Sequence, residues 1–212
     1  MVKNKHYRAF KDAGHITLIT VKHIEEALKN VKKCKHAKEG AALLLLLYYT
    51  GARPNEVLNL RAKDVVKKQN HLLVSLRGSK GGLPRTIHLP FARRLVKKIY
   101  DYVCTVYDEL FLFHNYRTIY VRRRKNVAGD KTLLYEESTN LLRYYFKKWF
   151  KGVVDDPIPP YYLRHNRFSQ LSMAGIDLQH IRMLKGSRSV ESVMPYVHLS
   201  TKMSKHIATK IK

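Results

Sequence analysis

The chain has 212 residues, a hydrophobic fraction of 45%, and a formal net charge of +25 from 41 Lys plus Arg against 16 Asp plus Glu. The length fits one domain, and the hydrophobic fraction suffices for a packed core, which excludes a globally disordered chain. So large a positive excess favours a polyanionic partner. Nucleic acid is the first candidate because neutralised phosphates release their counterions. An anionic membrane surface and simple solubility are the alternatives.

The cysteines and the apolar runs exclude further classes. Cys34 and Cys104 have neither a CxxC partner nor the spacing of metal ligands, so we expect no disulfide framework and no zinc site. The longest apolar run, 41–49, is too short to span a bilayer, and the amino terminus has no apolar signal core. These features predict a soluble cytoplasmic protein without a membrane partner.

The amino-terminal part predicts an arm followed by helices. Residues 1–15 are basic and polar, and we expect them to be loosely held. Thr20 is a candidate cap for a first helix, because the apolar residues that follow recur at helical spacing up to Val31. After a Lys-rich turn, the run 41–49 predicts a buried second helix that stops near Thr50-Gly51.

Residues 54–90 predict a short helix and a β-hairpin. Pro54 suits the start of a helix over 55–60. The stretch 71–89 contains two strand-like segments, LLVSL and RTIHL, separated by the glycine-rich turn RGSKGG. We therefore expect a hairpin with a basic tip, ended by Pro90.

The remaining sequence predicts helices separated by irregular stretches. Helices are expected over 91–107, over 139–149, and from Tyr162 onward with breaks at Gly175 and Gly186. The basic stretch 116–131 fits an irregular DNA-facing loop or a helix start, and DDPIPP at 155–160 fits a rigid connector. The pattern contains no internal repeat, low-complexity tract or second domain.

Three segments resemble the motifs of one enzyme family. TGARPNEVLNLRAKDV at 50–65 is similar to the first arginine box of the tyrosine recombinases, the family of phage integrases and Xer proteins. The segment 163–198, from LRHNRF to PYVH, resembles their second arginine box running into the tyrosine segment. Between them, GSKGGLPRTIHL at 78–89 resembles the hairpin with the family's catalytic lysine. The order and spacing of these boxes form a strong signal over about 16–200.

The resemblance implies a mainly α-helical fold with a small antiparallel sheet. It implies a catalytic domain over 16–212, with a tail at about 200–212. The amino-terminal core-binding domain usual in the family is not obvious in the sequence, which fits either an isolated catalytic domain or a minimal enzyme. The implied activity is site-specific cleavage and rejoining of DNA through a 3′-phosphotyrosine, which integrates or excises mobile DNA. Double-stranded DNA is the implied partner, with tetramers on DNA, no small-molecule substrate, no metal and no other cofactor. Departures from the family pattern at Tyr161 and Ser187 suggest a divergent archaeal or viral branch, which a virus or plasmid could encode.

The same resemblance assigns four catalytic residues. Arg53 and Arg164 would bind the non-bridging phosphate oxygens, because guanidiniums form forked hydrogen bonds and keep their charge. Lys80 would protonate the departing 5′-oxygen. Tyr196 would be the nucleophile, and its phenol, with a pKa of about 10, needs a base or a cationic site to ionise.

The sequence departs from the family at two auxiliary positions. Tyr161 stands where the family usually has histidine, three residues before the second arginine, and tyrosine is a poor base. Ser187, followed by Arg188, stands where histidine or tryptophan is usual. The general base therefore remains open between His165, His198 and water, and a structural role is favoured for His165.

Further residues are assigned to support or to DNA. Glu56 and Asp64 match acids of the first box and are expected to hold it together rather than to react. The basic residues Arg77, Arg85, Arg122, Arg123 and Arg124 are expected to contact the DNA backbone without base specificity.

Two other functions fit the same sequence. The chemistry could serve chromosome-dimer resolution or strand relaxation instead of mobile DNA. The two altered auxiliary positions also fit a DNA-binding module with impaired catalysis.

Overall fold

The computed structural model describes residues 18–79, 81–125, 131–155 and 157–196, with the side chains of 118–125 and 131–138 excepted. The predicted arm at 1–15, Lys80, His198 and the tail at 200–212 lie outside the described residues. The helices are α2 (Val21–Val31), α3 (Ala37–Thr50), α4 (Pro54–Leu58), α5 (Arg94–Val103), α6 (Asn140–Trp149), α7 (Tyr162–Met173) and α8 (Leu178–Lys185). The strands are β1 (Val65–Lys68), β2 (His71–Leu76), β3 (Arg85–Pro90), β4 (Thr118–Lys125) and β5 (Lys131–Ser138), and the short 3-10 turns are η1 (Ala62–Asp64), η2 (His114–Tyr116) and η3 (Glu191–Val193).

Helix α3 is the centre of the core. Each side chain from Leu43 to Leu47 is at most 1% exposed, and α3 packs against α2, α5 and α7. A helix that is apolar on every side is stable only when it is surrounded by protein, as the sequence predicted for 41–49. The helix ends at Gly51, whose φ of 60° is readily adopted by glycine, and the chain turns there towards Arg53.

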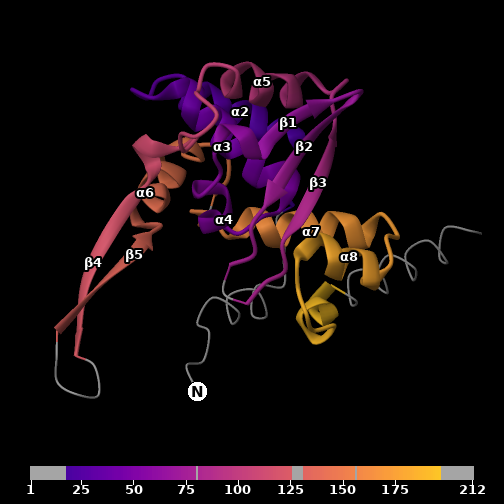
Figure 1. Cartoon of the computed structure of the whole chain (residues 1–212). Helices are drawn as coiled ribbons and strands as arrows, with labels where there is room; N and C mark the ends of the chain where they lie inside the picture. Colours follow the sequence, from indigo (N-terminus) through magenta and orange to yellow (C-terminus); the bar gives the residue numbers. More distant parts are fainter. Residues whose placement is uncertain (1–17, 80, 126–130, 156, 197–212) are drawn as a thin grey trace, which may run out of the picture.

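The sheet lies beside this helical core (Figure 1). Its strands are antiparallel in the order β1-β2-β3, and Val74 pairs with Ile87 in the predicted hairpin. Leu72, Val74 and Leu76 are buried, as alternation along β2 requires. The sequence did not predict β1, because three of its four residues (VVKK) are exposed and resemble a polar linker.

The second hairpin corrects the expectation for 116–131. Instead of an irregular loop or helix start, the structure has β4 paired antiparallel with β5, from Thr118 opposite Ser138 to Lys125 opposite Lys131. The basic run hides the strand pattern, and the pairing partner comes from a later segment that the sequence reading did not assign. This two-stranded ribbon extends from the body next to α6 (Figure 1).

The helical boundaries follow local contacts. Helix α5 starts three residues later than expected, because the Phe91 amide donates to the Asn70 carbonyl and still belongs to the hairpin end. The break at Gly175 and the end of α8 at Gly186 are confirmed, with φ values of 79° and 64°. Among the described helices, none is long and apolar enough to cross a bilayer. The fold is mainly α-helical with a small antiparallel sheet, as predicted.

Candidate active site

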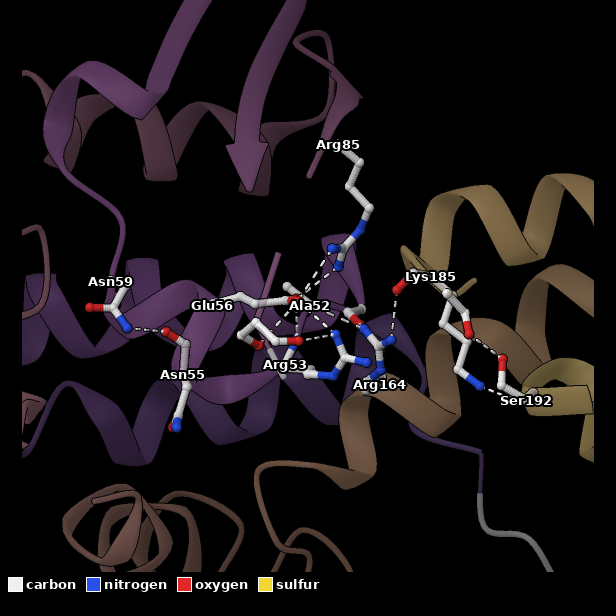
Figure 2. A network of polar contacts seen from close by, with 12 residues as sticks. Ala52, Arg53, Asn55, Glu56, Asn59, Arg85, Arg164, Lys185 and Ser192 are labelled. Atoms are coloured by element: carbon white, nitrogen blue, oxygen red, sulfur yellow. Dashed lines mark hydrogen bonds and ion pairs between the residues drawn. The ribbon is translucent and has the colours of Figure 1, made fainter. Parts of the chain in front are cut away.

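Glu56 lies at the centre of the candidate site (Figure 2). Its side chain is 0% exposed. Arg53 caps α4, and both its backbone amide and its Nη1 donate to the Glu56 carboxylate at 2.9 Å. Arg85 approaches from β3 and donates through Nη2 at 2.8 Å, while Arg164 Nη1 lies 4.0 Å from the same carboxylate. Three guanidiniums, from the start of α4, from β3 and from α7, therefore surround one buried carboxylate.

This cluster retains an excess of positive charge. Burial alone would raise the pKa of Glu56, but the hydrogen bonds and charge of Arg85 and the amide of Arg53 outweigh it, so the pKa is lowered. A carboxylate among three arginines leaves two positive charges uncompensated within the cluster. Such a site favours an anion with several oxygens, such as a phosphodiester.

Arg164 is held from two sides by backbone carbonyls, which occupy only two of its five N–H donors. It is 1% exposed, and its Nη1 and Nη2 donate to the carbonyls of Gly51 at 2.8 Å and Lys185 at 2.7 Å. Burial, followed by the charge of Arg53, lowers its pKa to about 10, so it remains a cation at neutral pH. Its buried Nε has no hydrogen-bond partner among the described residues. A buried donor without a partner is costly, and an anionic oxygen would satisfy it.

The loop between β2 and β3 packs onto the first arginine. Arg53 Nη1 donates to the Ser79 carbonyl at 3.2 Å, and the Leu83 amide donates to the Gly186 carbonyl at 3.0 Å. A Cβ atom at Gly82 would lie 2.4 Å from Arg53 Nη1, so a larger residue would displace the guanidinium. The described parts of this loop thus join the two arginine boxes.

Tyr196 is buried in a small cluster formed by α7, α8 and η3. Its side chain is 1% exposed, and its ring packs on Phe168 with centroids 6.0 Å apart. Its hydroxyl lies 3.0 Å from His165 Nδ1, and the Ser172 hydroxyl donates to its carbonyl at 2.7 Å. His165 follows Arg164 on α7, so the hydrogen-bond partner of Tyr196 is the direct neighbour of the second arginine.

His165 is uncharged at neutral pH. Burial, followed by the charges of Lys185 and Arg164, lowers its pKa to about 4. A neutral imidazole can accept the phenol hydrogen at Nδ1, but a base with so low a pKa takes up a proton weakly. The contact therefore orients the phenol more effectively than it deprotonates it.

The auxiliary residues are spread around this cluster. Tyr161 is 40% exposed, and its ring lies edge-on to His165 with centroids 5.1 Å apart. Ser187 accepts a hydrogen bond from the Ser192 hydroxyl at 2.6 Å and donates to the Ser189 carbonyl. Arg188 is exposed, and its carbonyl accepts from Arg182. Ser187 and Arg188 thus order the turn between α8 and Tyr196.

Among the described side chains assigned to support or DNA contact, Arg85 differs from the expectation, because it is buried against protein groups. Its side chain is 7% exposed, and Nε donates to the Leu184 carbonyl at 2.7 Å, so its donors are directed to protein groups instead of to solvent. Positive charge in the sequence does not reveal a buried acid such as Glu56. Arg77 is exposed at 66%, and it lies 3.6 Å from Asp64, which also accepts from the Arg61 amide. The side chains of Arg122, Arg123 and Arg124 lie outside the described part of the structure.

Sequence reasoning missed Lys185. This residue is 8% exposed, and its ammonium contacts the Ser192 carbonyl (Figure 2). Its Nζ lies 5.2 Å from the centre of the Tyr196 ring. A signal was available, because Lys185 follows the buried Ile181 by four residues and so falls on the same helix face.

Removing the buried acid is expected to destabilise the protein strongly. Glu56→Ala leaves the buried Arg85 and the partly buried Arg53 without their carboxylate, which costs about 3–5 kcal/mol in unfolding free energy. Glu109→Ala is the matched control, since Glu109 also pairs with two cations, Arg61 and Lys63, but is 67% exposed. Urea unfolding measures both variants. If Glu56→Ala loses no more unfolding free energy than the exposed control Glu109→Ala, the buried acid does not support the fold.

His165 is expected to give stability a distinct pH dependence. Its pKa is about 4 in the folded state and about 6.5 in the unfolded state, so the unfolded chain binds more protons between these values. Stability from this group is present above pH 6.5 and is lost as the pH falls towards 4, by up to about 3 kcal/mol. As the pH falls from about 6.5 to about 4, the wild type should lose unfolding free energy relative to His165→Gln, because glutamine does not take up a proton. A constant difference would contradict a buried neutral histidine.

Comparisons with known structures agree with this architecture. The crystal structure of XerA recombinase has a TM-score of 0.63 at 18% identity, covering 93% of this chain and 64% of that chain. The XerH recombinase bound to its difH substrate gives a TM-score of 0.61 at 19% identity, covering 91% and 54%. A λ integrase dimer bound to a core site gives a TM-score of 0.55 at 15% identity, covering 90% and 55%. At these identities the likeness establishes the fold alone.

Sequence comparisons establish the family. The chain is 30% identical over 189 residues to tyrosine recombinase XerA of Pyrococcus horikoshii, covering 89% of this chain and 60% of the relative. Transposase A of transposon Tn554 from Staphylococcus aureus is 29% identical over 181 residues, covering 82% and 47%. The chain thus spans about half to three fifths of the length of these curated relatives. The model of the phage integrase family matches residues 17–203. The chain therefore belongs to the phage integrase family.

Proposed function

We propose that this chain is the catalytic domain of a site-specific DNA recombinase that breaks and rejoins strands through Tyr196. The observation that carries the proposal is the joining of the tyrosine to the arginine cluster. His165 and Arg164 are adjacent on α7. His165 contacts the Tyr196 hydroxyl, and Arg164 has a buried Nε for which the described residues offer no hydrogen-bond partner. Integration or excision of mobile DNA is the favoured role, since the relatives include a transposase of transposon Tn554.

In the proposed reaction, the Tyr196 oxygen attacks the scissile phosphorus and the bond to the 5′-oxygen breaks. The products are a 3′-phosphotyrosine and a free 5′-hydroxyl. Arg53 and Arg164 stabilise the charge that grows on the non-bridging oxygens. Lys80 donates the proton that the 5′-oxygen takes up, and the phenol proton leaves to a base or to water. Attack by another 5′-hydroxyl reverses these steps, so the bond energy is retained and ATP is not required.

The burial of Tyr196 adds a condition to this mechanism. A side chain that is 1% exposed cannot contact a DNA phosphate, so attack requires the groups that cover the phenol to move aside. The Tyr196 hydroxyl must then exchange His165 for the phosphate. We propose that DNA binding drives this exchange and that assembly of several copies, up to a tetramer, accompanies it.

The DNA partner follows from the charge. The net charge of +25 is larger than the positive charge of the arginine cluster at the site. XerH and λ integrase, which have a similar fold, are described in complexes with DNA sites. We propose that exposed cations such as Arg77, together with Arg122, Arg123 and Arg124 in the basic strand of the ribbon, bind the DNA backbone.

A nicked suicide substrate tests the proposed reaction. A pool of duplexes with randomised sequence carries a nick just 3′ of the cleavage position, so the short released strand diffuses away and rejoining stops. The wild-type protein should form an adduct that survives denaturation, and sequencing of the adducts yields the preferred site. DNA binding without any adduct would instead support the binding module.

Recombination between two copies of the recovered site then tests the biological role. Integration or excision should convert a two-site plasmid into recombinant products. Relaxation without such products would favour a strand-relaxing activity over exchange.

A further inference from the structure

The carboxyl end of α8 contains a buried lysine that the mechanism above does not use. Lys185 is 8% exposed, and none of the described acids forms an ion pair with it. Its ammonium contacts the Ser192 carbonyl and the face of the Tyr196 ring, with 5.2 Å from Nζ to the ring centre. Its own carbonyl accepts from Arg164 Nη2 at 2.7 Å. Lys185 thus contacts both the second arginine and the tyrosine segment.

The charges that face Lys185 are unfavourable for an ammonium. Arg164 and Arg53 approach from α7 and α4, while the neutral His165 and the phenol of Tyr196 complete the described surroundings. Burial and the two guanidiniums lower the pKa of Lys185 to about 8. A buried cation without an acid destabilises a fold. Its presence here therefore needs a reason other than stability.

We propose that Lys185 is a positioning residue for strand cleavage, which holds the tyrosine segment against the second arginine and favours the ionised phenol by its charge. The inference rests on the proposed function. Lys185 gives up no proton in the reaction; it remains an ammonium while the phenol proton leaves to a base or to water. A cation over an aromatic ring attracts the ring, and it attracts a phenolate more strongly because the phenolate carries a full negative charge.

Two variants test the role. K185M keeps the length of the side chain but removes its charge, and it should form the suicide-substrate adduct about tenfold more slowly at saturating DNA. The same variant should be as stable as the wild type or more stable in urea, because a buried charge is replaced by an apolar group. K148M is the matched control, since Lys148 lies over the Tyr144 ring at 4.5 Å on α6, away from the site.

The pH profile gives the second readout. The wild-type cleavage rate should fall above about pH 8, where Lys185 loses its proton. K185R should retain cleavage without this alkaline fall, because arginine remains charged there. An unchanged adduct rate in K185M overturns the inference, and so does a K185R profile that keeps the fall. A K185M protein that is both slower and less stable would assign a structural role and also overturn it. Failure of the proposed function is distinct, because the wild type would then form no adduct.

Discussion

Replacing Tyr196 with phenylalanine is expected to abolish the covalent adduct while DNA affinity stays within about twofold of the wild type. The substitution removes only the attacking oxygen, and the net charge that binds the backbone does not change. Stability should fall by about 1 kcal/mol, since one hydrogen bond to His165 is lost. Gel separation under denaturing conditions measures the adduct, and a filter-binding titration measures the affinity.

Tyr116→Phe is the matched control for this loss. Tyr116 is also buried, and its hydroxyl donates to the His36 carbonyl at 3.2 Å, in the part of the core formed with Trp149. The control variant should keep the adduct at wild-type yield. If Tyr196→Phe still forms the adduct, the nucleophile is another residue.

Arg164→Ala should reduce the rate of cleavage at least about 10²–10³-fold, with a much smaller loss of DNA affinity. The rate falls because the growing charge on the phosphate loses a forked donor, while many other cations still hold the backbone. Arg164→Lys keeps a charge but not the fork, so it should recover only part of the rate. Single-turnover cleavage at saturating DNA measures both variants.

Stability must be compared in the same experiment, because Arg164 also ties Gly51 to Lys185 through their carbonyls. Leaving these acceptors unpaired costs about 1–3 kcal/mol, which is compatible with a folded protein. Arg94→Ala is the control for charge alone, since Arg94 is 75% exposed on α5. Equal losses of binding and cleavage in Arg164→Ala would mean that the arginine positions DNA instead of stabilising the transition state.

The parts of the fold with local signals could be predicted from the sequence. The apolar run of α3, the hairpin around a glycine-rich turn and the glycine breaks at 175 and 186 depend on neighbouring residues alone. Strands β1 and β4 could not be predicted, because their pairing partners give them their structure and their own residues are largely polar. Tertiary context overrides local propensity most strongly in such edge segments.

The site shows the same division. The motif order singled out Arg53, Arg164 and Tyr196, which the structure connects through Glu56, His165 and Lys185. The different placement of Arg85 could not be predicted, because burial of a positive charge depends on the acid it meets across 29 residues of sequence. Lys185 was missed because lysine is rarely buried. Its spacing of four residues from Ile181 indicated the buried helix face, but its residue type indicated the surface.

The most direct test of the account identifies the protein atom that holds the DNA. The trapped adduct is digested with nuclease and protease, and mass spectrometry locates the nucleotide on a peptide. We predict a 3′-nucleotide on the peptide that contains Tyr196, bonded through its phenol oxygen. A nucleotide on another residue, such as Tyr161 or a serine, would contradict the assignment of the nucleophile on which the mechanism rests.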